Sequence, residues 1–314
     1  LYEVLEIADR ITVIRRGKVV GSRIPSETDE DDLAELMVGR EVQLTVDRGE
    51  SHPAEPMLQV EDLRVAGGHG GDVVDGVSLE VRAGEILGVA GVAGNGQDEL
   101  VEAITGLRQP RSGSITLDGE DVTSDGTRDL HGKNVAYVPA DRHRFGLVLS
   151  FPLTDNAVLT DYYMEPYSHG LIRDEGAIAK RADEAIAQYD VRTPGATVTA
   201  GTLSGGNQQK LIVAREFDRE LKLLVLDQPT RGLDVGSIEF IHKQVISKRD
   251  AGTAVLLVSA ELDEVLELSD RIAVMYRGKI VAVVEGRTAN KEEVGLLMAT
   301  GGRAEGTSSE GAAS

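Results

Sequence analysis

Three short segments, in a fixed order along the chain, constrain the fold most strongly. Residues 86–98 read as a buried strand, a glycine-rich turn and the start of a helix. Residues 201–210 begin a second helix with a serine and two glycines, and residues 223–235 form an apolar strand that ends on Asp227 and Gln228. Together these segments predict an α/β domain with a mostly parallel sheet, whose ligand loops lie at the carboxyl ends of the strands.

Composition limits the class of protein. Of the 314 residues 41% are hydrophobic, which is enough for a core, and 4% are aromatic with no Trp, so the core is aliphatic. The formal net charge of −20 repels a nucleic-acid backbone and argues against nucleic acid as a partner. The absence of cysteine rules out disulfides and thiolate metal sites. The longest apolar runs have the length of strands and are too short to cross a membrane.

The first twenty residues recur near the end of the chain. Residues 1–20 align with residues 262–281, thirteen of the twenty pairs are identical, and the same offset of 261 continues to Met37 and Met298. The repeat predicts a tandem protein whose first unit is represented here by its last helix, hairpin and terminal helix, in residues 1–45. We expect the apolar side chains of this segment to pack on the missing domain, so that here the segment is mobile or associates in a non-native way. They are Val4, Leu5, Ile11, Val13, Leu33 and Leu36.

The rest of the chain divides into a linker, one complete unit and a tail. Residues 46–57 are polar and proline-bearing, as in a linker. Residues 58–302 form the complete unit, with β-rich segments first and a helical insertion at about 145–200. Strands and helices then alternate, among them strands at 223–227 and 254–259 and helices at 207–217 and 262–268. Residues 303–314 have the Gly/Ser/Ala/Glu-rich composition of a disordered tail.

The glycine loop, residues 91–98, keeps the backbone of a phosphate site without its usual side chains. Its candidate nucleotide-binding residues are Gly91, Gly94, Asn95, Gly96, Gln97 and Asp98. Glycines let backbone N–H groups approach a phosphate at a helix start. Neutral Gln97 replaces the usual cation and Asp98 the usual hydroxyl. A like charge at about 4 Å costs about 4 kcal/mol at a dielectric near 20, although Asp98 could offset this by holding Mg²⁺. A structural or weakly binding loop is favoured over a catalytic loop, and a glycine turn that serves only packing is the third alternative.

The serine–glycine segment, residues 203–208, is intact. It consists of Leu203, Ser204, Gly205, Gly206, Asn207 and Gln208. Free N–H groups and the helix dipole at such a helix start favour an anion. An ordinary serine N-cap is the alternative for a segment of this kind alone, and the neighbouring glycine loop and acidic strand favour the anion site.

These residues resemble the ATP-binding subunit of the simple-sugar and nucleoside importers of the ABC family, in which two cassettes lie in one polypeptide. The resemblance covers the second cassette and the tail of the first, which is nearly the whole chain. The segments most similar to the nucleoside-import branch are residues 91–100, 189–195, 228–236, 238–242 and 259–264. The resemblance implies an ABC-type P-loop nucleotide-binding domain with a mostly parallel core sheet, an antiparallel β subdomain and a helical subdomain.

The resemblance also implies roles for single residues. Asp227 is the expected Mg²⁺ ligand, with Asp98 as a further candidate. Gln228 stands at the position of the catalytic base, where an amide cannot accept a proton, and Ala260 stands at the position of the switch histidine. In two cassettes stacked head to tail, the serine–glycine segment faces ATP held by the first cassette, and Asp234 contacts the other half. That composite site hydrolyses ATP, whereas this cassette's own site is degenerate.

The function implied by the resemblance is the energy-coupling, ATP-binding component of a nucleoside or sugar importer. Its cofactors are ATP and Mg²⁺, and it is an ATPase in the assembled protein but weak or inactive as this chain alone. Its partners are the first cassette, two integral-membrane permease subunits that dock near residues 140–156 and, indirectly, an extracytoplasmic substrate-binding protein, at the cytoplasmic face of the membrane. A non-hydrolytic regulatory cassette and a soluble cassette protein acting on ribosomes or DNA are the alternatives.

Overall fold

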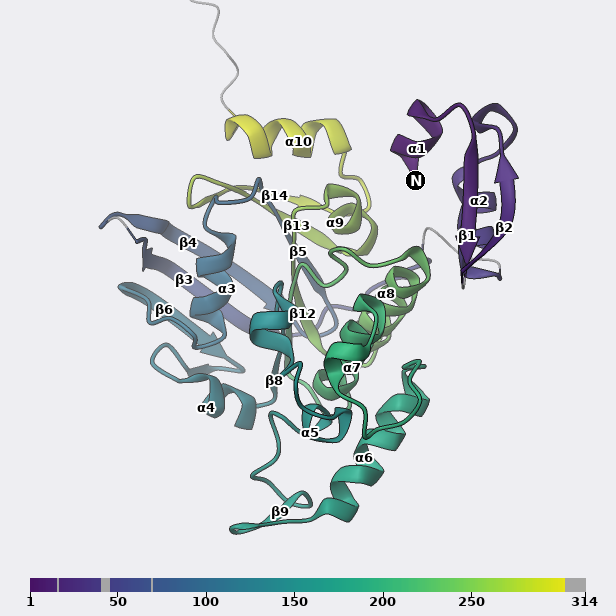
Figure 1. The fold of residues 1–314 in the computed structure, drawn as a ribbon. Coiled ribbons are helices and arrows are strands. Elements are labelled where there is room, and N and C mark those ends of the chain that lie inside the picture. The colour runs from purple at the N-terminus through teal and green to yellow at the C-terminus, as the bar shows by residue number, and fades with distance from the viewer. Residues whose placement is uncertain (16, 41–45, 69, 303–314) are drawn as a thin grey trace, which may run out of the picture. The chain divides into compact units, whose positions relative to one another are not determined.

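The computed structural model describes residues 1–15, 17–40, 46–68 and 70–302, which divide into two compact units (Figure 1). The first unit comprises Leu1–Gly49, Asp141–Asp218 and Pro229–Ser247. The second comprises Glu50–Ala140, Arg219–Gln228 and the residues from Lys248 onward. The predicted tail, 303–314, lies outside the described residues, as does the end of the predicted N-terminal segment, 41–45. We describe the two units separately.

A six-stranded sheet with the order β14-β13-β5-β12-β11-β8 forms the centre of the second unit. Five strands pair in parallel and β14 joins the edge in antiparallel orientation. The strands are β5 (Ile86–Ala90), β8 (Val135–Val138), β11 (Leu223–Asp227), β12 (Ala254–Ser259), β13 (Arg271–Tyr276) and β14 (Lys279–Glu285). Every residue of β5, β11 and β12 is buried, which explains their continuous aliphatic sequences. The predicted mostly parallel sheet is confirmed.

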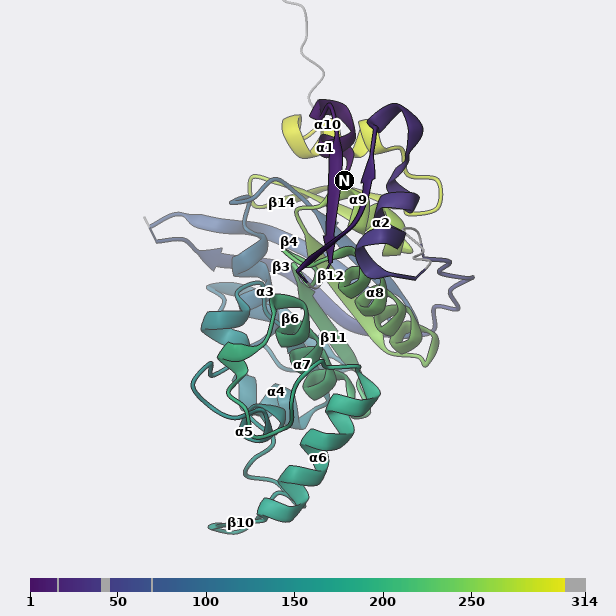
Figure 2. The ribbon, with the colours of Figure 1, turned by 45° about the vertical axis from the view of Figure 1, so that its right-hand side comes forward.

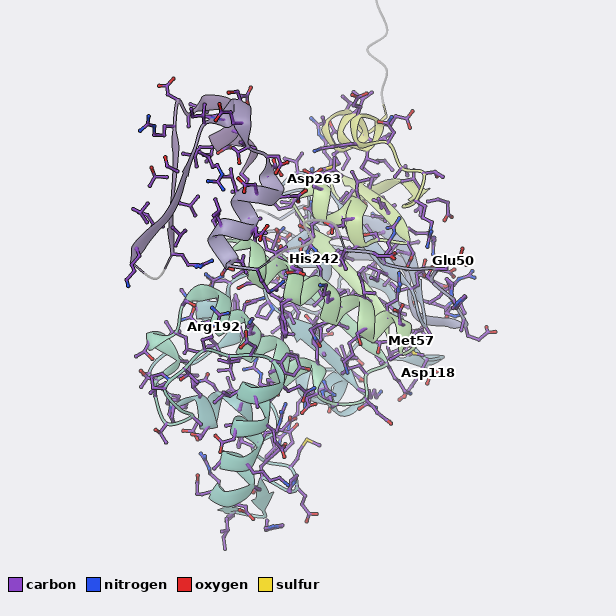
Figure 3. All side chains as sticks on the ribbon, turned by 90° about the vertical axis from the view of Figure 1, so that its right-hand side faces the viewer. Glu50, Met57, Asp118, Arg192, His242 and Asp263 are labelled. Atoms are coloured by element: carbon purple, nitrogen blue, oxygen red, sulfur yellow. The ribbon has the colours of Figure 1, made fainter. Side chains whose placement is uncertain are left out.

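A second sheet in the same unit is antiparallel, with the order β4-β3-β6-β7. Its strands are β3 (Pro56–Ala66), β4 (Asp72–Arg82), β6 (Ser112–Leu117) and β7 (Glu120–Asp121). Inward-facing residues such as Leu58, Val60 and Ile115 share one hydrophobic core with Leu87 and Leu256 of the parallel sheet. At the β6–β7 turn, Asp118 donates its backbone N–H to the carbonyl oxygen of Met57 over 2.7 Å, and Figure 3 shows the two residues side by side.

Helices complete the second unit around these sheets. They are α3 (Gln97–Ile104), α4 (Thr127–Gly132), α9 (Leu262–Leu268) and α10 (Lys291–Thr300). Leu100 and Ile104 of α3 enter the shared core, whereas Val294 and Met298 of α10 pack with Val265 of α9 in a separate cluster. None of the helices that the structure describes combines the length and the apolar character needed for a membrane span.

Helices dominate residues 141–247 of the first unit. The elements are a π-helical turn (Arg142–Gly146), α5 (Leu153–Ala157), α6 (Glu175–Gln188), a 3₁₀ turn (Ala200–Thr202), α7 (Gly205–Phe217) and α8 (Val235–Asp250), whose last residues belong to the second unit. A short hairpin, β9 (Ser168–His169) and β10 (Ile172–Arg173), precedes α6, as Figure 2 shows, and was not predicted. Helix α7 begins two residues before the predicted 207, because Ser204 is its N-cap.

Asn156 organises the loop before α5. Its side chain is fully buried and makes four hydrogen bonds to backbone groups. Oδ1 accepts the N–H of Val148 over 2.9 Å, and Nδ2 donates to the carbonyl oxygens of Val148, Phe151 and Pro152 over 3.0, 3.2 and 3.1 Å. One amide therefore satisfies backbone groups that this irregular segment leaves unpaired.

Replacing Asn156 by alanine is expected to lower the free energy of unfolding by about 2–4 kcal/mol, because several backbone groups lose their partner in a buried place. Chemical denaturation measures the loss. Asn290→Ala is the control: Asn290 is an N-cap that accepts from the N–H groups of Glu292 and Glu293, and its loss should cost about 1 kcal/mol. Equal losses for the two variants would contradict the assigned role of Asn156.

The N-terminal segment folds into a small assembly within the first unit. Its elements are α1 (Tyr2–Ile7), β1 (Ile11–Arg15), β2 (Lys18–Arg23), a 3₁₀ turn (Pro25–Glu27) and α2 (Glu30–Val38). Ile11, Val13 and Leu33 are buried together, with Leu5 and Leu36 packed against them, whereas Val4 is 43% exposed. The apolar residues that we expected to pack on a missing domain thus largely cover one another.

The sequence repeat is also a structural repeat. Strands β1 and β2 pair in antiparallel orientation with a register shift between Val13 and Ile14. Strands β13 and β14 pair in the same way, with the shift between Val274 and Met275, 261 positions further on. In each copy a helix precedes the hairpin and another follows it. The two regions therefore share their irregularities as well as their sequence.

Candidate nucleotide site

The glycine loop connects β5 to α3 in the second unit. Gly96 caps α3 with φ 104°, and a Cβ there would lie 2.5 Å from the carbonyl oxygen of Val73 in β4. Gly94 also has a positive φ, 86°, but open space surrounds it. Gly96 therefore serves the close packing of the loop, which is one of the roles that the sequence left open.

The Gln97 side chain turns back onto its own loop. Oε1 accepts the backbone N–H of Asn95 and Nε2 donates to the carbonyl oxygen of Val92, each over 3.1 Å. Gln97 is 6% exposed. A Cβ at Gly91 would lie 2.3 Å from Gln97 Nε2, so this glycine leaves room for the amide. The residue that replaces the usual cation is thus part of the loop's internal structure.

The turn between β13 and β14 holds the loop from another side. The N–H of Arg277 donates to Asn95 Oδ1 over 2.8 Å, and the N–H of Gly278 donates to the Asn95 carbonyl oxygen over 2.9 Å. Gly278 has φ 79° and lies close to Val73. This support was not predicted from the sequence. Its one available signal was the Arg-Gly-Lys turn, which recurs at residues 16–18 and 277–279.

Acidic groups gather near the loop. Asp98 is exposed in the first turn of α3, and Asp227 is 5% exposed at the end of β11. Tyr137 of β8, which the sequence analysis did not single out, hydrogen-bonds to Asp227. Burial raises the pKa of Tyr137, and the negative charges of Asp227, Glu102 and Asp98 raise it further. The local field therefore favours a cation and opposes added phosphate charge.

The ends of the neighbouring parallel strands β11 and β12 bring Gln228 and Ala260 together. Gln228 has a left-handed backbone, φ 49°, and donates its N–H to the Val258 carbonyl oxygen over 2.8 Å. Its side-chain Oε1 accepts the N–H of Ala260 over 3.2 Å. The amide thus links the ends of β11 and β12, and the exposed methyl group of Ala260 offers no hydrogen bond.

The serine–glycine segment lies in the first unit at the start of α7. Ser204 is the N-cap, and its Oγ accepts from Asn207 Nδ2 over 2.9 Å, which leaves the hydroxyl proton available. A Cβ at Gly206 would lie 2.3 Å from Ser237 Oγ, and one at Gly205 would lie 2.8 Å from the Arg142 guanidinium. Gly206 is therefore required by a close neighbour that Asp234 holds in place, whereas the flexible end of Arg142 could move away from a side chain at position 205.

The other side chains of the segment support the helix start. Leu203 is 9% exposed and Gln208 is 5% exposed. Gln208 Nε2 donates to the Ala200 carbonyl oxygen over 3.1 Å, and its Oε1 lies 2.9 Å from Nε2 of His143. These contacts tie the first turn of α7 to the preceding 3₁₀ turn and to the π-helical turn.

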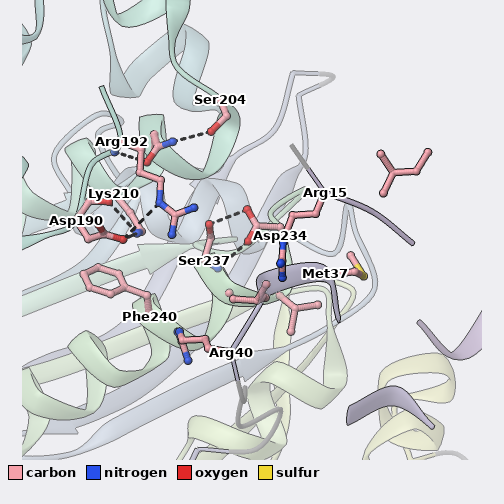
Figure 4. Close-up of a pocket in the computed structure, with 15 residues that line it drawn as sticks. Arg15, Met37, Arg40, Asp190, Arg192, Ser204, Lys210, Asp234, Ser237 and Phe240 are labelled. Atoms are coloured by element: carbon pink, nitrogen blue, oxygen red, sulfur yellow. Dashed lines mark hydrogen bonds and ion pairs between the residues drawn. The ribbon is translucent and has the colours of Figure 1, made fainter. Parts of the chain in front are cut away.

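A hollow of about 410 Å³ lies beside the serine–glycine segment (Figure 4). Its charged lining residues are Arg15, Arg40, Arg192, Lys210, Asp190 and Asp234. Cations outnumber carboxylates there, although the whole chain carries a net charge of −20. Both carboxylate oxygens of Asp234 accept hydrogen bonds from Ser237. Oδ1 accepts from the backbone N–H over 3.0 Å, and Oδ2 accepts from the hydroxyl over 2.8 Å. Asp234 therefore caps the start of α8.

Comparison with known proteins identifies the family. The model of the ABC transporter family matches residues 74–231, about half of the chain, from β4 through the glycine loop and the serine–glycine segment to the end of β11. The chain therefore belongs to the ABC transporter family, as its sequence predicted.

Curated relatives extend the similarity over nearly the whole chain. The guanosine import ATP-binding protein NupO of Bacillus subtilis (strain 168) is 48% identical over 93% of this chain. The nucleoside import ATP-binding protein NupA of Lactococcus lactis subsp. cremoris (strain MG1363) is 49% identical over 96%. The glucose import ATP-binding protein TsgD13 of Haloferax volcanii is 43% identical over 98%. The chain spans 58%, 60% and 56% of the lengths of these relatives, respectively.

The fold is also that of solved cassettes. A nucleotide-free ATP-binding cassette from an ABC transporter superposes with a TM-score of 0.64 at 22% identity, covering 78% of this chain and 96% of the other. This likeness shows the fold alone. The P-loop nucleotide-binding fold is confirmed, and ATP and Mg²⁺ are the cofactors of this family, as predicted.

The glycine loop and the serine–glycine segment fit these cofactors differently. Asp227 and Asp98 have the oxygen chemistry that Mg²⁺ prefers. The described residues contain no group of three or more His, Cys, Asp or Glu side chains placed to hold a metal. The glycine loop has its Asn95 N–H and its Gln97 amide already hydrogen-bonded to each other. The serine–glycine segment, by contrast, keeps a free hydroxyl proton beside a cationic hollow.

Proposed function

We propose that this chain is the ATP-binding, energy-coupling part of an importer for nucleosides, with simple sugars as the alternative substrates. The similarity of nearly the whole chain to two nucleoside-import proteins, at 48% and 49% identity, carries this proposal. The sugar alternative rests on the glucose-import relative, which is 43% identical.

The chain is further proposed to be the second cassette of a tandem polypeptide. Residues 1–45 are the tail of the first cassette, 46–57 the linker and 58–302 the second cassette with its helical subdomain at about 145–200. The repeated hairpin, with its register shift at the same relative position, supports this division. So does the length of the relatives, of which the chain spans 56–60%.

In this arrangement the chain supplies hydrogen-bond donors that bind phosphate, and it does not supply a catalytic base. The Ser204 hydroxyl and the first N–H groups of α7 point their hydrogens out of a helix start, where the dipole also favours an anion. Arg192 and Lys210 line the neighbouring hollow, where both pair with Asp190, over 3.8 and 3.1 Å. The Ser204 hydroxyl and the N–H groups of the helix start orient the terminal phosphate of a nucleotide held by the first cassette. Gln228 cannot accept a proton from water, so the chain's own loop belongs to a degenerate site.

Partners follow from the same arrangement. The first cassette completes the composite site, with Asp234 near the boundary between the halves. Two permease subunits dock at residues 140–156, where the exposed rings of Phe145 and Phe151 (52% and 45% exposed) offer apolar contact to a membrane subunit. The protein then lies at the cytoplasmic face of the membrane, and an extracytoplasmic substrate-binding protein acts through the permeases.

Mixing experiments test this function. Mg-ATP hydrolysis is measured for this chain alone, for the first cassette made separately and for the mixture. Turnover is expected in the mixture and to be at least about a hundredfold lower for this chain alone. Ser204→Arg should reduce the turnover of the mixture by about a hundredfold or more, because it removes a donor and fills the phosphate position.

Ser124→Arg is the matched control, since Ser124 is exposed on the other unit. It should leave turnover unchanged. Comparable turnover by the chain alone would overturn the degenerate-site assignment. An unimpaired Ser204→Arg mixture would instead favour a non-hydrolytic regulatory cassette.

A further inference from the structure

We propose that Gln97 competes with nucleotide phosphate for the glycine loop, so that its amide sets the low affinity of this chain's own site. The inference rests on the proposed function only in taking the loop as this cassette's own nucleotide site. It assigns to Gln97 a role beyond the mere loss of a cation. The residue holds the loop in a form whose donors and acceptors satisfy one another.

Three groups of the loop hydrogen-bond to one another: the Asn95 N–H, the Gln97 amide and the Val92 carbonyl. The Asn95 N–H lies 3.1 Å from Gln97 Oε1 and 3.2 Å from the Val92 carbonyl oxygen, so it is shared between two acceptors. The Val92 carbonyl oxygen also accepts from Gln97 Nε2 over 3.1 Å. A phosphate oxygen that binds the Asn95 N–H must therefore displace the Gln97 amide.

The amide is built into the loop. Gln97 is 6% exposed, and its Nε2 fills the space beside Gly91, where a Cβ would approach within 2.3 Å. Asn95 cannot readily move away, because the N–H groups of Arg277 and Gly278 hold its side-chain and backbone oxygens over 2.8 and 2.9 Å. Phosphate entry thus requires the Gln97 side chain to leave rather than the loop to shift.

The negative charge near the loop also opposes phosphate binding. Asp98, in the next position, and Asp227, at the end of β11, are carboxylates that act together on the Tyr137 hydroxyl. A neutral amide at position 97 does not offset them. Competition by the amide and repulsion by these charges are separable effects, because a neutral replacement of Gln97 changes only the first.

The variant Gln97→Met distinguishes an amide that competes with phosphate from an amide that hydrogen-bonds to phosphate. Methionine has a similar length, no donor and no charge. If the amide competes with phosphate, the variant binds Mg-ATP about tenfold more tightly, since phosphate no longer displaces two hydrogen bonds. If the amide instead donates to phosphate, the variant binds more weakly. Gln97→Lys tightens binding in either case and serves to show that the loop can accept a phosphate.

The experiment titrates the full chain with Mg-ATP by calorimetry and follows the backbone amide signals of residues 94–98 by NMR, which localises binding to the loop. Tighter binding by Gln97→Met, with Asn95 N–H responding to ATP, supports the proposal. Unchanged, weaker or still undetectable binding overturns it. Should Gln97→Met lose its thermal unfolding transition, Gln97→Ala, which adds no volume, takes its place with the same expectation. The Ser204→Arg result is independent of this one, so the proposed function and this inference can fail separately.

Discussion

Replacing Arg249 by leucine is expected to lower the free energy of unfolding by about 3–5 kcal/mol. Arg249 is fully buried at the end of α8, and its guanidinium lies 3.2 Å from Asp270 Oδ1. Asp270 is 8% exposed, and its other oxygen accepts the N–H of Ile86, the first residue of β5. The variant would leave a carboxylate buried without its cation at the beginning of β5, an inner strand of the central sheet. Chemical denaturation with a common m-value measures the change.

Arg82→Leu provides the matched control. Arg82 also pairs with a carboxylate, Glu80, over 2.9 Å, but its side chain is 46% exposed. Water and salt screen such a pair, so the free energy of unfolding should hardly change. Arg249→Lys keeps the charge and should lose less than the leucine variant. Similar behaviour of the Arg249→Leu and Arg82→Leu variants would show that the burial of Arg249 does not matter.

Replacing Gly96 by alanine is expected to destabilise the second unit by about 3–4 kcal/mol and to displace the glycine loop. The backbone there has φ 104°, which strains any residue with a Cβ, and that atom would lie 2.5 Å from the Val73 carbonyl oxygen. Because Val73 belongs to β4, the backbone itself would have to move. Thermal unfolding and the amide signals of residues 95–98 report the two effects.

Gly94→Ala separates the backbone strain from the steric clash. Gly94 has φ 86° and no atom within 4 Å of the position of a Cβ. This variant should therefore cost only about 1–2 kcal/mol, for the left-handed backbone. A larger loss for Gly94→Ala than for Gly96→Ala would refute the close packing of the loop on β4.

Much of the fold could be predicted because the chain's local patterns are strong. The strands at Leu223–Asp227 and Ala254–Ser259 and the helix at Leu262–Leu268 have the predicted bounds. Their aliphatic runs are bounded by polar residues, and the spacing of the apolar residues indicates clearly whether each segment is a strand or a helix. The hairpin at 168–173 escaped prediction because its strands are two residues long and carry no alternating pattern.

The candidate site was predictable in its parts and less so in its contacts. Glycine spacing placed the loop before α3, whereas the hydrogen bond between Gln228 and Ala260 became visible only in the sheet. Tyr137 and the Arg277–Gly278 turn were missed. Tyr137 reaches Asp227 only because β8 and β11 are neighbours in the sheet, and the turn reaches Asn95 from 182 positions away.

By itself, the sequence determined the family, the repeat and the chemical nature of each site residue, because glycine spacing, aliphatic runs and side-chain type are local properties of the chain. Only the tertiary structure decided what those residues do in place. In the structure Gln97 hydrogen-bonds to its own loop, Gly96 allows the loop to pack on β4, and Asp234 caps the start of α8. The physical reason is that hydrogen bonds and steric contacts depend on which backbone groups folding brings within about 3 Å, and no local pattern records that.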